Sequence, residues 1–168
     1  MGGQSWTVGV LVQANHGLRP WLSILGRAVG QLMPEGCFSE QEAGPIIVIL
    51  ATDAPLSGLA LRQMAKRVAL GIGRGGTSGG NNSGDIFLAP SIADPGPMPG
   101  AATALITRQE INIDRTDPLY PAAVEAVEEA VANAIVAGEE AVTVKPRGKV
   151  CHAIDARRLT EIFTGEAG

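Results

Sequence analysis

The chain is poor in cysteine, in aromatic residues and in net charge. Its two cysteines, Cys37 and Cys151, lie far apart in 168 residues and lack the paired spacing or neighbouring histidines of a metal or redox site. Aromatic residues make up 4% of the sequence, and 13 Lys and Arg against 17 Asp and Glu give a net charge of -4 without a basic stripe. We therefore expect no metal, no cofactor and no nucleic-acid partner.

Long apolar runs are also absent. No stretch approaches the ~20 apolar residues of a membrane-spanning helix, and the first residues lack the charged and apolar regions of an export signal. We therefore expect no membrane partner and a cytoplasmic location. With 45% apolar and 18% charged residues, the chain is long enough to bury a core as a single domain, residues 1–168.

The apolar patterns that are present predict a layered α/β fold. Residues 6–14 are rich in β-branched residues and predict a strand, and the apolar run 45–52 predicts a second strand buried on both faces. Helical spacing follows from Leu59 to Ile72, and we expect Asp53 to cap this helix rather than to act as a catalytic acid. Further patterns predict strands at 86–89, 103–107, 111–113 and 141–144, and helices over 122–137 and 155–163.

The most unusual stretch is the glycine-rich turn over residues 74–85. Gly71–Gly76 satisfies G-x-G-x-x-G, but it ends a helix instead of opening one after a strand, so dinucleotide binding is excluded. Ser83 stands in the turn before Gly84, where the missing Cβ lets other backbone approach closely. Composition alone describes a plain loop of ordinary turn residues. Ser83 is nevertheless our candidate nucleophile, for the following reason.

Residues 81–89, Asn-Asn-Ser-Gly-Asp-Ile-Phe-Leu-Ala, resemble the processing site of the P1-family or DmpA-type serine peptidases, which include L-aminopeptidase/D-esterases and β-aminopeptidases. Blocks at 8–17, 49–56, 124–130 and 155–159 resemble the same family in the same order. The likeness covers nearly the whole chain and the second half of the longer family members. It implies homo-oligomers and a helix-sheet-sheet-helix sandwich, of the type shared with ornithine acetyltransferase, that is incomplete in this chain.

The resemblance also implies a mechanism. Family precursors cut themselves before the serine, here between Asn82 and Ser83, which would give segments 1–82 and 83–168. Ser83 would then carry a free α-amine, whose pKa near ~8 lets it accept the hydroxyl proton. The expected reaction is hydrolysis of the N-terminal residue of short peptides or of amino-acid amides and esters through an acyl-enzyme. Since no Ser-His pair is needed, we interpret His16 as a loop residue.

Two more site residues follow from the resemblance. Asn15 lies in a block close to the nucleophile, and a side-chain N–H aimed at a developing oxyanion is worth ~3 kcal/mol; its plain alternative is a turn residue. Glu125 matches the glutamate of a Ser-x-Glu pair and lies at the edge of an apolar stripe, from which it could reach inward. Its plain alternative, shared with Glu128 and Glu129, is a solvated helix face.

A competing hypothesis is a non-catalytic fragment or structural subunit of the same family. The first half of the family length is missing, and Pro90 and Ala123 stand where family members carry phenylalanine and serine. A denaturing gel distinguishes the hypotheses, because a processed chain gives two segments while an inert chain stays at 17.3 kDa.

Overall fold

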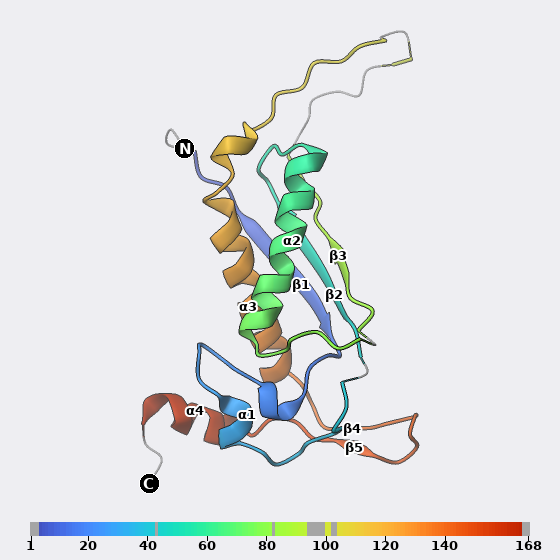
Figure 1. Ribbon diagram of the computed structural model, residues 1–168, viewed down its shortest axis with the longest axis vertical. Coiled ribbons are helices and arrows are strands. Elements are labelled where there is room, and N and C mark those ends of the chain that lie inside the picture. Colours follow the sequence, from blue (N-terminus) through green and yellow to red (C-terminus); the bar gives the residue numbers. More distant parts are fainter. Residues whose placement is uncertain (1–3, 43, 82, 94–99, 102–103, 166–168) are drawn as a thin grey trace.

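Two long helices cover one face of a three-stranded sheet (Figure 1). The computed structural model describes residues 4–42, 44–81, 83–93, 100–101 and 104–165. Its main strands are β1 (Val8–Ala14), β2 (Ile46–Thr52) and β3 (Ile86–Leu88), in the order β1-β2-β3. β1 pairs antiparallel with β2, and β2 pairs parallel with β3. This mixture of helix and sheet is the α/β class that the sequence predicts.

The helix layer consists of α2 (Gly58–Arg74) and α3 (Leu119–Val136). Both helices bury one apolar stripe, and β2 buries every second residue against them. The fully or nearly fully buried residues of this core include Met64, Val68, Val127 and Val131 from the helices and Ile46, Val48 and Leu50 from β2. The helices predicted over 59–72 and 122–137 are thus present and enclose one side of the sheet.

The other side of the sheet, which we call the far face, is apolar but exposed. Its most exposed large side chains are Leu11 on β1, Ile47 on β2, and Ile86 and Leu88 on β3. The prediction that β2 is buried on both faces is therefore wrong, because within the described residues no layer covers the far face. The described chain forms one helix layer and one sheet layer, which is half of a helix-sheet-sheet-helix sandwich.

The helix cap differs from the prediction. Ser57 is the N-cap of α2, and its hydroxyl accepts a hydrogen bond from the Ala60 backbone N–H at 3.2 Å. Asp53, which the sequence suggested as the cap, instead accepts a hydrogen bond from the Thr7 backbone N–H at 2.6 Å. Ser57 is four positions after Asp53, and the Asp53 carboxylate ties the end of β2 to the start of β1 rather than to the helix.

β3 lies at the edge of the sheet, the position in which a proline beside a strand is tolerated. The Thr52 N–H donates to the Pro90 carbonyl at 3.2 Å, so Pro90 contributes its carbonyl to the pairing with the end of β2 although it has no N–H to donate. The strands predicted over 103–107 and 111–113 are not formed in described residues 104–113. That segment projects from the body of the molecule and returns to it (Figure 1) at the short helix η2 (Ile113–Arg115). Within the described residues no strand pairs with it.

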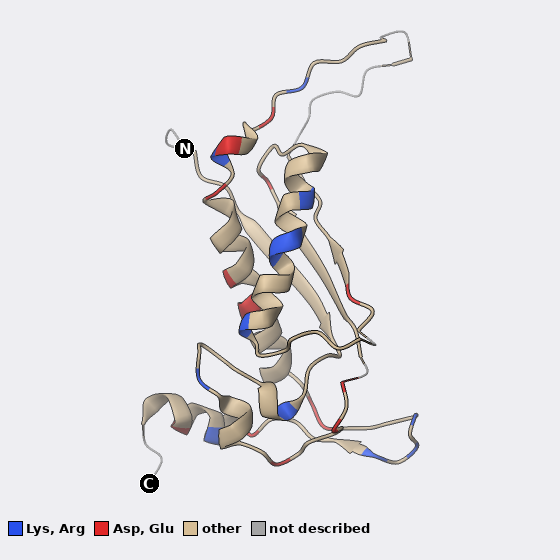
Figure 2. Cartoon of the chain, in the orientation of Figure 1, with Lys and Arg blue, Asp and Glu red and all other residues tan. Residues whose placement is uncertain are grey.

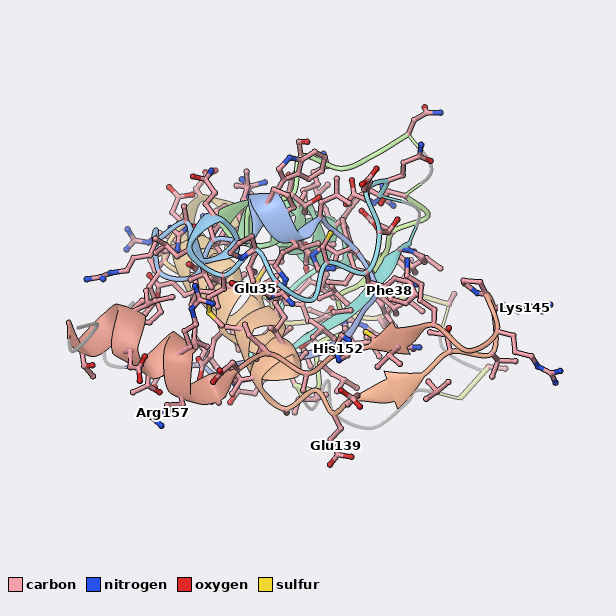
Figure 3. The ribbon with its side chains drawn as sticks, turned by 90° about the horizontal axis from the view of Figure 1, so that it is seen from below. Glu35, Phe38, Glu139, Lys145, His152 and Arg157 are labelled. Carbon is pink, nitrogen blue, oxygen red and sulfur yellow. The ribbon has the colours of Figure 1, made fainter. Side chains whose placement is uncertain are left out.

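A smaller region lies below the sheet in Figure 1. It contains η1 (Arg19–Trp21), α1 (Val29–Leu32), the hairpin of β4 (Ala141–Val142) and β5 (Val150–Cys151), and α4 (Ala156–Thr164). Its buried cluster is Val29, Met33 and Leu159. Seen from below, Lys145 at the hairpin tip and Arg157 on α4 point away from the body (Figure 3). Cys37 and Cys151 are exposed free thiols.

Candidate active site

Ser83 lies in the loop that joins α2 to β3, half-buried at one end of the sheet. Its backbone N–H donates to the Gly80 carbonyl at 2.9 Å, which closes a turn. Its hydroxyl donates to Asp85 Oδ1 at 2.5 Å, and the same oxygen accepts the Ile46 backbone N–H at 3.0 Å. Because Ile46 is the buried first residue of β2, the Ser83 hydroxyl is linked through one carboxylate to the core strand.

Asn15 is brought to the same end of the sheet. It follows β1, whose last residue Ala14 pairs with Ile46, and β3 starts beside the start of β2 because these strands are parallel. The Asn15 N–H donates to the Pro45 carbonyl at 3.2 Å. A Cβ at Gly44 would lie 1.8 Å from the Asn15 carbonyl oxygen, so glycine is required there for this close approach. Asn15 and Ser83 therefore flank the start of β2, while the role of Asn15 as an amide donor stays a prediction.

Glu42 is a residue of this region that sequence reasoning missed. Its Oε1 accepts the Gly17 backbone N–H at 2.8 Å and the Thr77 hydroxyl at 2.7 Å. Its Oε2 is buried without a hydrogen-bond partner among the described residues, and a Cβ at Gly80 would approach it to 2.9 Å. One carboxylate thus joins the segment after β1 to the glycine-rich loop. The partners are 25 and 35 residues away in sequence, so no local pattern pointed to Glu42.

His16 lies close to both carboxylates of this region. Burial lowers the pKa of His16 from 6.5, while the charges of Asp85 and Glu42 partly oppose the shift. Its Nδ1 is buried and has no hydrogen-bond partner within the described part of the chain. The described hydrogen bonds of Ser83 go to Gly80 and Asp85 and not to His16, which agrees with the expectation that Ser83 needs no histidine partner. His16 nevertheless lies within electrostatic reach of Asp85 and Glu42, which its interpretation as a loop residue did not predict.

Glu125 lies elsewhere, on the side of α3 that faces away from the sheet. It is exposed, whereas its neighbours Ala123 and Val124 are buried. It lines a groove of about 380 Å³ between α3 and residues 22–25, together with Glu128 and Glu129. Glu128 pairs with Arg74 at 3.0 Å. No hydrogen bond or ion pair among the described residues joins Glu125 to Ser83 or Asn15, so its catalytic role stays a prediction.

The charged residues of the described chain are spread along it and form no metal-binding cluster. The view in Figure 2 shows basic and acidic residues interspersed along the chain. Within the described residues, no three His, Cys, Asp or Glu side chains gather to hold a metal ion, and no helix is both long and apolar enough to cross a membrane. Asn82, the first residue of the predicted cleavage pair, lies outside the described residues.

Solved structures of known proteins share this fold. The L-aminopeptidase D-Ala-esterase/amidase of Ochrobactrum anthropi, a serine aminopeptidase with a variant of the Ntn hydrolase fold, has a TM-score of 0.86 at 45% identity, over 98% of this chain and 45% of that chain. A β-aminopeptidase of a Burkholderia species has a TM-score of 0.80 at 34% identity, over 97% and 45%. The neighbours of this α/β fold are thus DmpA-type proteins of the Ntn hydrolase class.

The sequence comparisons identify the family of this chain within the class. The β-peptidyl aminopeptidase BapA of Sphingosinicella microcystinivorans is 40% identical over 154 residues, which is 83% of this chain and 39% of that protein. The profile of peptidase family S58 matches residues 1–148, and the chain belongs to this family. The resemblance drawn from residues 81–89 and the other blocks is confirmed. The chain spans less than half the length of these relatives.

Proposed function

We propose that this chain is the nucleophile-bearing part of a self-processing serine aminopeptidase, with Ser83 as the nucleophile. The observation that carries the proposal is the position of the Ser83 hydroxyl. It lies in a glycine-rich turn at the end of the sheet, with its proton directed at Asp85 Oδ1, 2.5 Å away. Membership of peptidase family S58 supports the same assignment.

The proposed mechanism has two stages. In the first, the Ser83 hydroxyl attacks the carbonyl of the preceding peptide bond, and water hydrolyses the resulting ester. In the second, Ser83 carries both a hydroxyl and a free α-amine, and the amine accepts the hydroxyl proton while the oxygen attacks a substrate carbonyl. The acyl-enzyme is then hydrolysed. Asn15, at the same end of the sheet, would donate its side-chain amide to the developing oxyanion.

The proposed substrates are short peptides and amino-acid amides or esters with a free N-terminal residue. The relatives are named for action on L-aminoacyl, D-alanyl and β-peptidyl compounds, which supports this class without separating its members. Exposed apolar surface on the far face supports assembly with further protein surface, for which a homo-oligomer is our proposal. Neither metal nor cofactor is required by this chemistry.

The test is the intact mass of the purified chain and of two serine variants. Wild type is expected to give segments 1–82 and 83–168, and Ser83→Ala to remain at 17.3 kDa with no hydrolysis of amino-acid amides. Ser78→Ala is the matched control, because Ser78 is an exposed serine of the same loop, and it should behave as wild type. A Ser83→Ala chain that still splits after residue 82 would refute the assignment. A wild-type chain that neither splits nor hydrolyses amides would leave the non-catalytic fragment instead.

A further inference from the structure

Asp85 has no role in the two-stage mechanism above, yet it is the group that holds the nucleophile. We propose that Asp85 is the proton acceptor for self-cleavage, the one step in which the α-amine of Ser83 is still locked in a peptide bond. The inference rests on the proposed function and assigns a different base to each stage. An amide nitrogen cannot take the hydroxyl proton, so the first stage needs a base other than the one that serves the second.

The geometry suits this role. The Ser83 hydroxyl donates to Asp85 Oδ1 at 2.5 Å, a length typical of a hydroxyl bound to a carboxylate. Oδ1 also accepts the Ile46 N–H at 3.0 Å, so the carboxylate is aligned by the start of a buried strand rather than by the loop alone. The Ser83 N–H donates to the Gly80 carbonyl at 2.9 Å, so the backbone nitrogen of Ser83 is also held in place.

The proton balance closes on these residues. As Ser83 Oγ attacks the preceding carbonyl carbon, the hydroxyl proton moves to Asp85. The C–N bond then breaks, the acyl group stays on Oγ as an ester, and the nitrogen leaves as an amine with the proton that Asp85 returns. Water hydrolyses the ester to a carboxylic acid and restores the hydroxyl. Asp85 ends unchanged, and Ser83 has gained the amine that serves the second stage.

Other charged groups near Asp85 are poorer candidates for this proton. His16 faces both Asp85 and Glu42, but its described contacts include no hydrogen bond to Ser83. The Glu42 carboxylate is engaged by Gly17 and Thr77 through Oε1. Of these three groups, Asp85 alone has a recorded hydrogen bond to the reacting oxygen. His16 is the natural comparison because it is the other base within electrostatic reach.

The test follows the intact mass of freshly synthesised full-length chain over time. Asp85→Asn retains an oxygen that can accept the Ile46 N–H and the Ser83 hydroxyl, so it removes basicity while leaving the strand anchor in place. We expect it to slow self-cleavage at least ~100-fold, the usual loss when a general base is removed. Asp85→Glu, which retains a carboxylate, should recover part of the rate. Asp114→Asn, a change at an exposed aspartate in η2, should process as wild type.

A pH profile separates proton transfer from a structural effect. The pH dependence of the processing rate should differ between wild type and Asp85→Asn, because the amide of asparagine cannot accept the hydroxyl proton. The melting temperature of each variant checks its fold. If Asp85→Asn is unfolded, Asp85→Glu decides: processing by the folded glutamate variant supports the proposal, and its absence overturns it.

The outcomes also separate this inference from the proposed function. Wild-type processing with an equally fast Asp85→Asn overturns the role of Asp85 and leaves Ser83 as the nucleophile. Loss of processing in His16→Gln but not in Asp85→Asn moves the proton to His16. A wild-type chain that never processes overturns the proposed function and this inference together.

Discussion

Both faces of the sheet are apolar, but the helices bury only one of them. On the helix side, Val48 and Leu50 of β2 are fully buried under α2 and α3. On the far face, Leu11, Ile86 and Leu88 are more than half exposed. A run such as residues 46–51 is typical of a strand covered on both sides. The apolar residues on the two faces of the sheet predict two packing interfaces, and the described residues form only the interface with the helices. This agrees with a chain length below half that of its relatives.

The candidate site lies at the end of the sheet and is anchored to the covered side. Ser83 is tied through Asp85 to Ile46, which is buried against the helix layer. Glu42 ties the glycine-rich loop to Gly17, just beyond β1. The candidate nucleophile therefore gains its position from the interface between the sheet and the helix layer, which the described chain forms itself. The far face contributes no recorded contact to Ser83 among the described residues.

The largest expected effect comes from matched leucine deletions on the two faces. Leu50 is 0% exposed and Leu11 is 67% exposed, on neighbouring strands. We expect Leu50→Ala to lower the free energy of unfolding by about 2–5 kcal/mol, because it removes buried area and leaves a cavity. Leu11→Ala should change it by less than about 0.5 kcal/mol as long as the far face is uncovered, as it is in the single chain. Urea unfolding of the two variants measures the difference, and equal losses would show that the far face is covered in solution.

Much of this arrangement follows from the sequence, and the failures have physical causes. The apolar spacing of α2 and α3 and the β-branched runs of β1 and β2 predict those elements, because periodicity reports which side is buried. The exposed side of β2 was missed, because an apolar run cannot show that its partner layer is absent. Glu42 and the contact from Asp85 to Ile46 were missed, because they join segments 25 to 39 residues apart without a local pattern.

The next effect in size tests how the helix layer begins. Ser57→Ala removes the hydroxyl that accepts the Ala60 N–H, and losing such a cap costs about 1 kcal/mol of stability. This loss would affect the buried face of the sheet, because α2 is one of the two helices that cover that face. Thermal unfolding checks the value, with Ser78→Ala as an exposed serine control. A Ser57→Ala chain as stable as the control would mean that the cap adds nothing to the helix layer.

The smallest expected effect is a change with pH in the free energy of unfolding, caused by His16 at the enclosed end of the sheet. Burial lowers the pKa of His16 below 6.5, so the folded chain takes up a proton at this site less readily than the unfolded chain does. The free energy of unfolding should therefore decrease as the pH falls from 6.5 toward the lowered pKa, and this contribution should level off below it. His16→Gln, which does not titrate, should flatten this dependence below pH 6.5.

The matched control for His16 is the other histidine, since the chain has two. His152 is exposed and lies beside Glu140, at 2.8 Å, in the smaller region below the sheet. His152→Gln should retain the slope that His16→Gln loses, because the penalty arises from enclosure and not from histidine itself. Denaturant unfolding of both variants at several pH values measures the slopes. If His16→Gln leaves the pH dependence of the free energy of unfolding unchanged, the end of the sheet at His16 is open to solvent. The candidate site would then not belong to the enclosed side of the sheet.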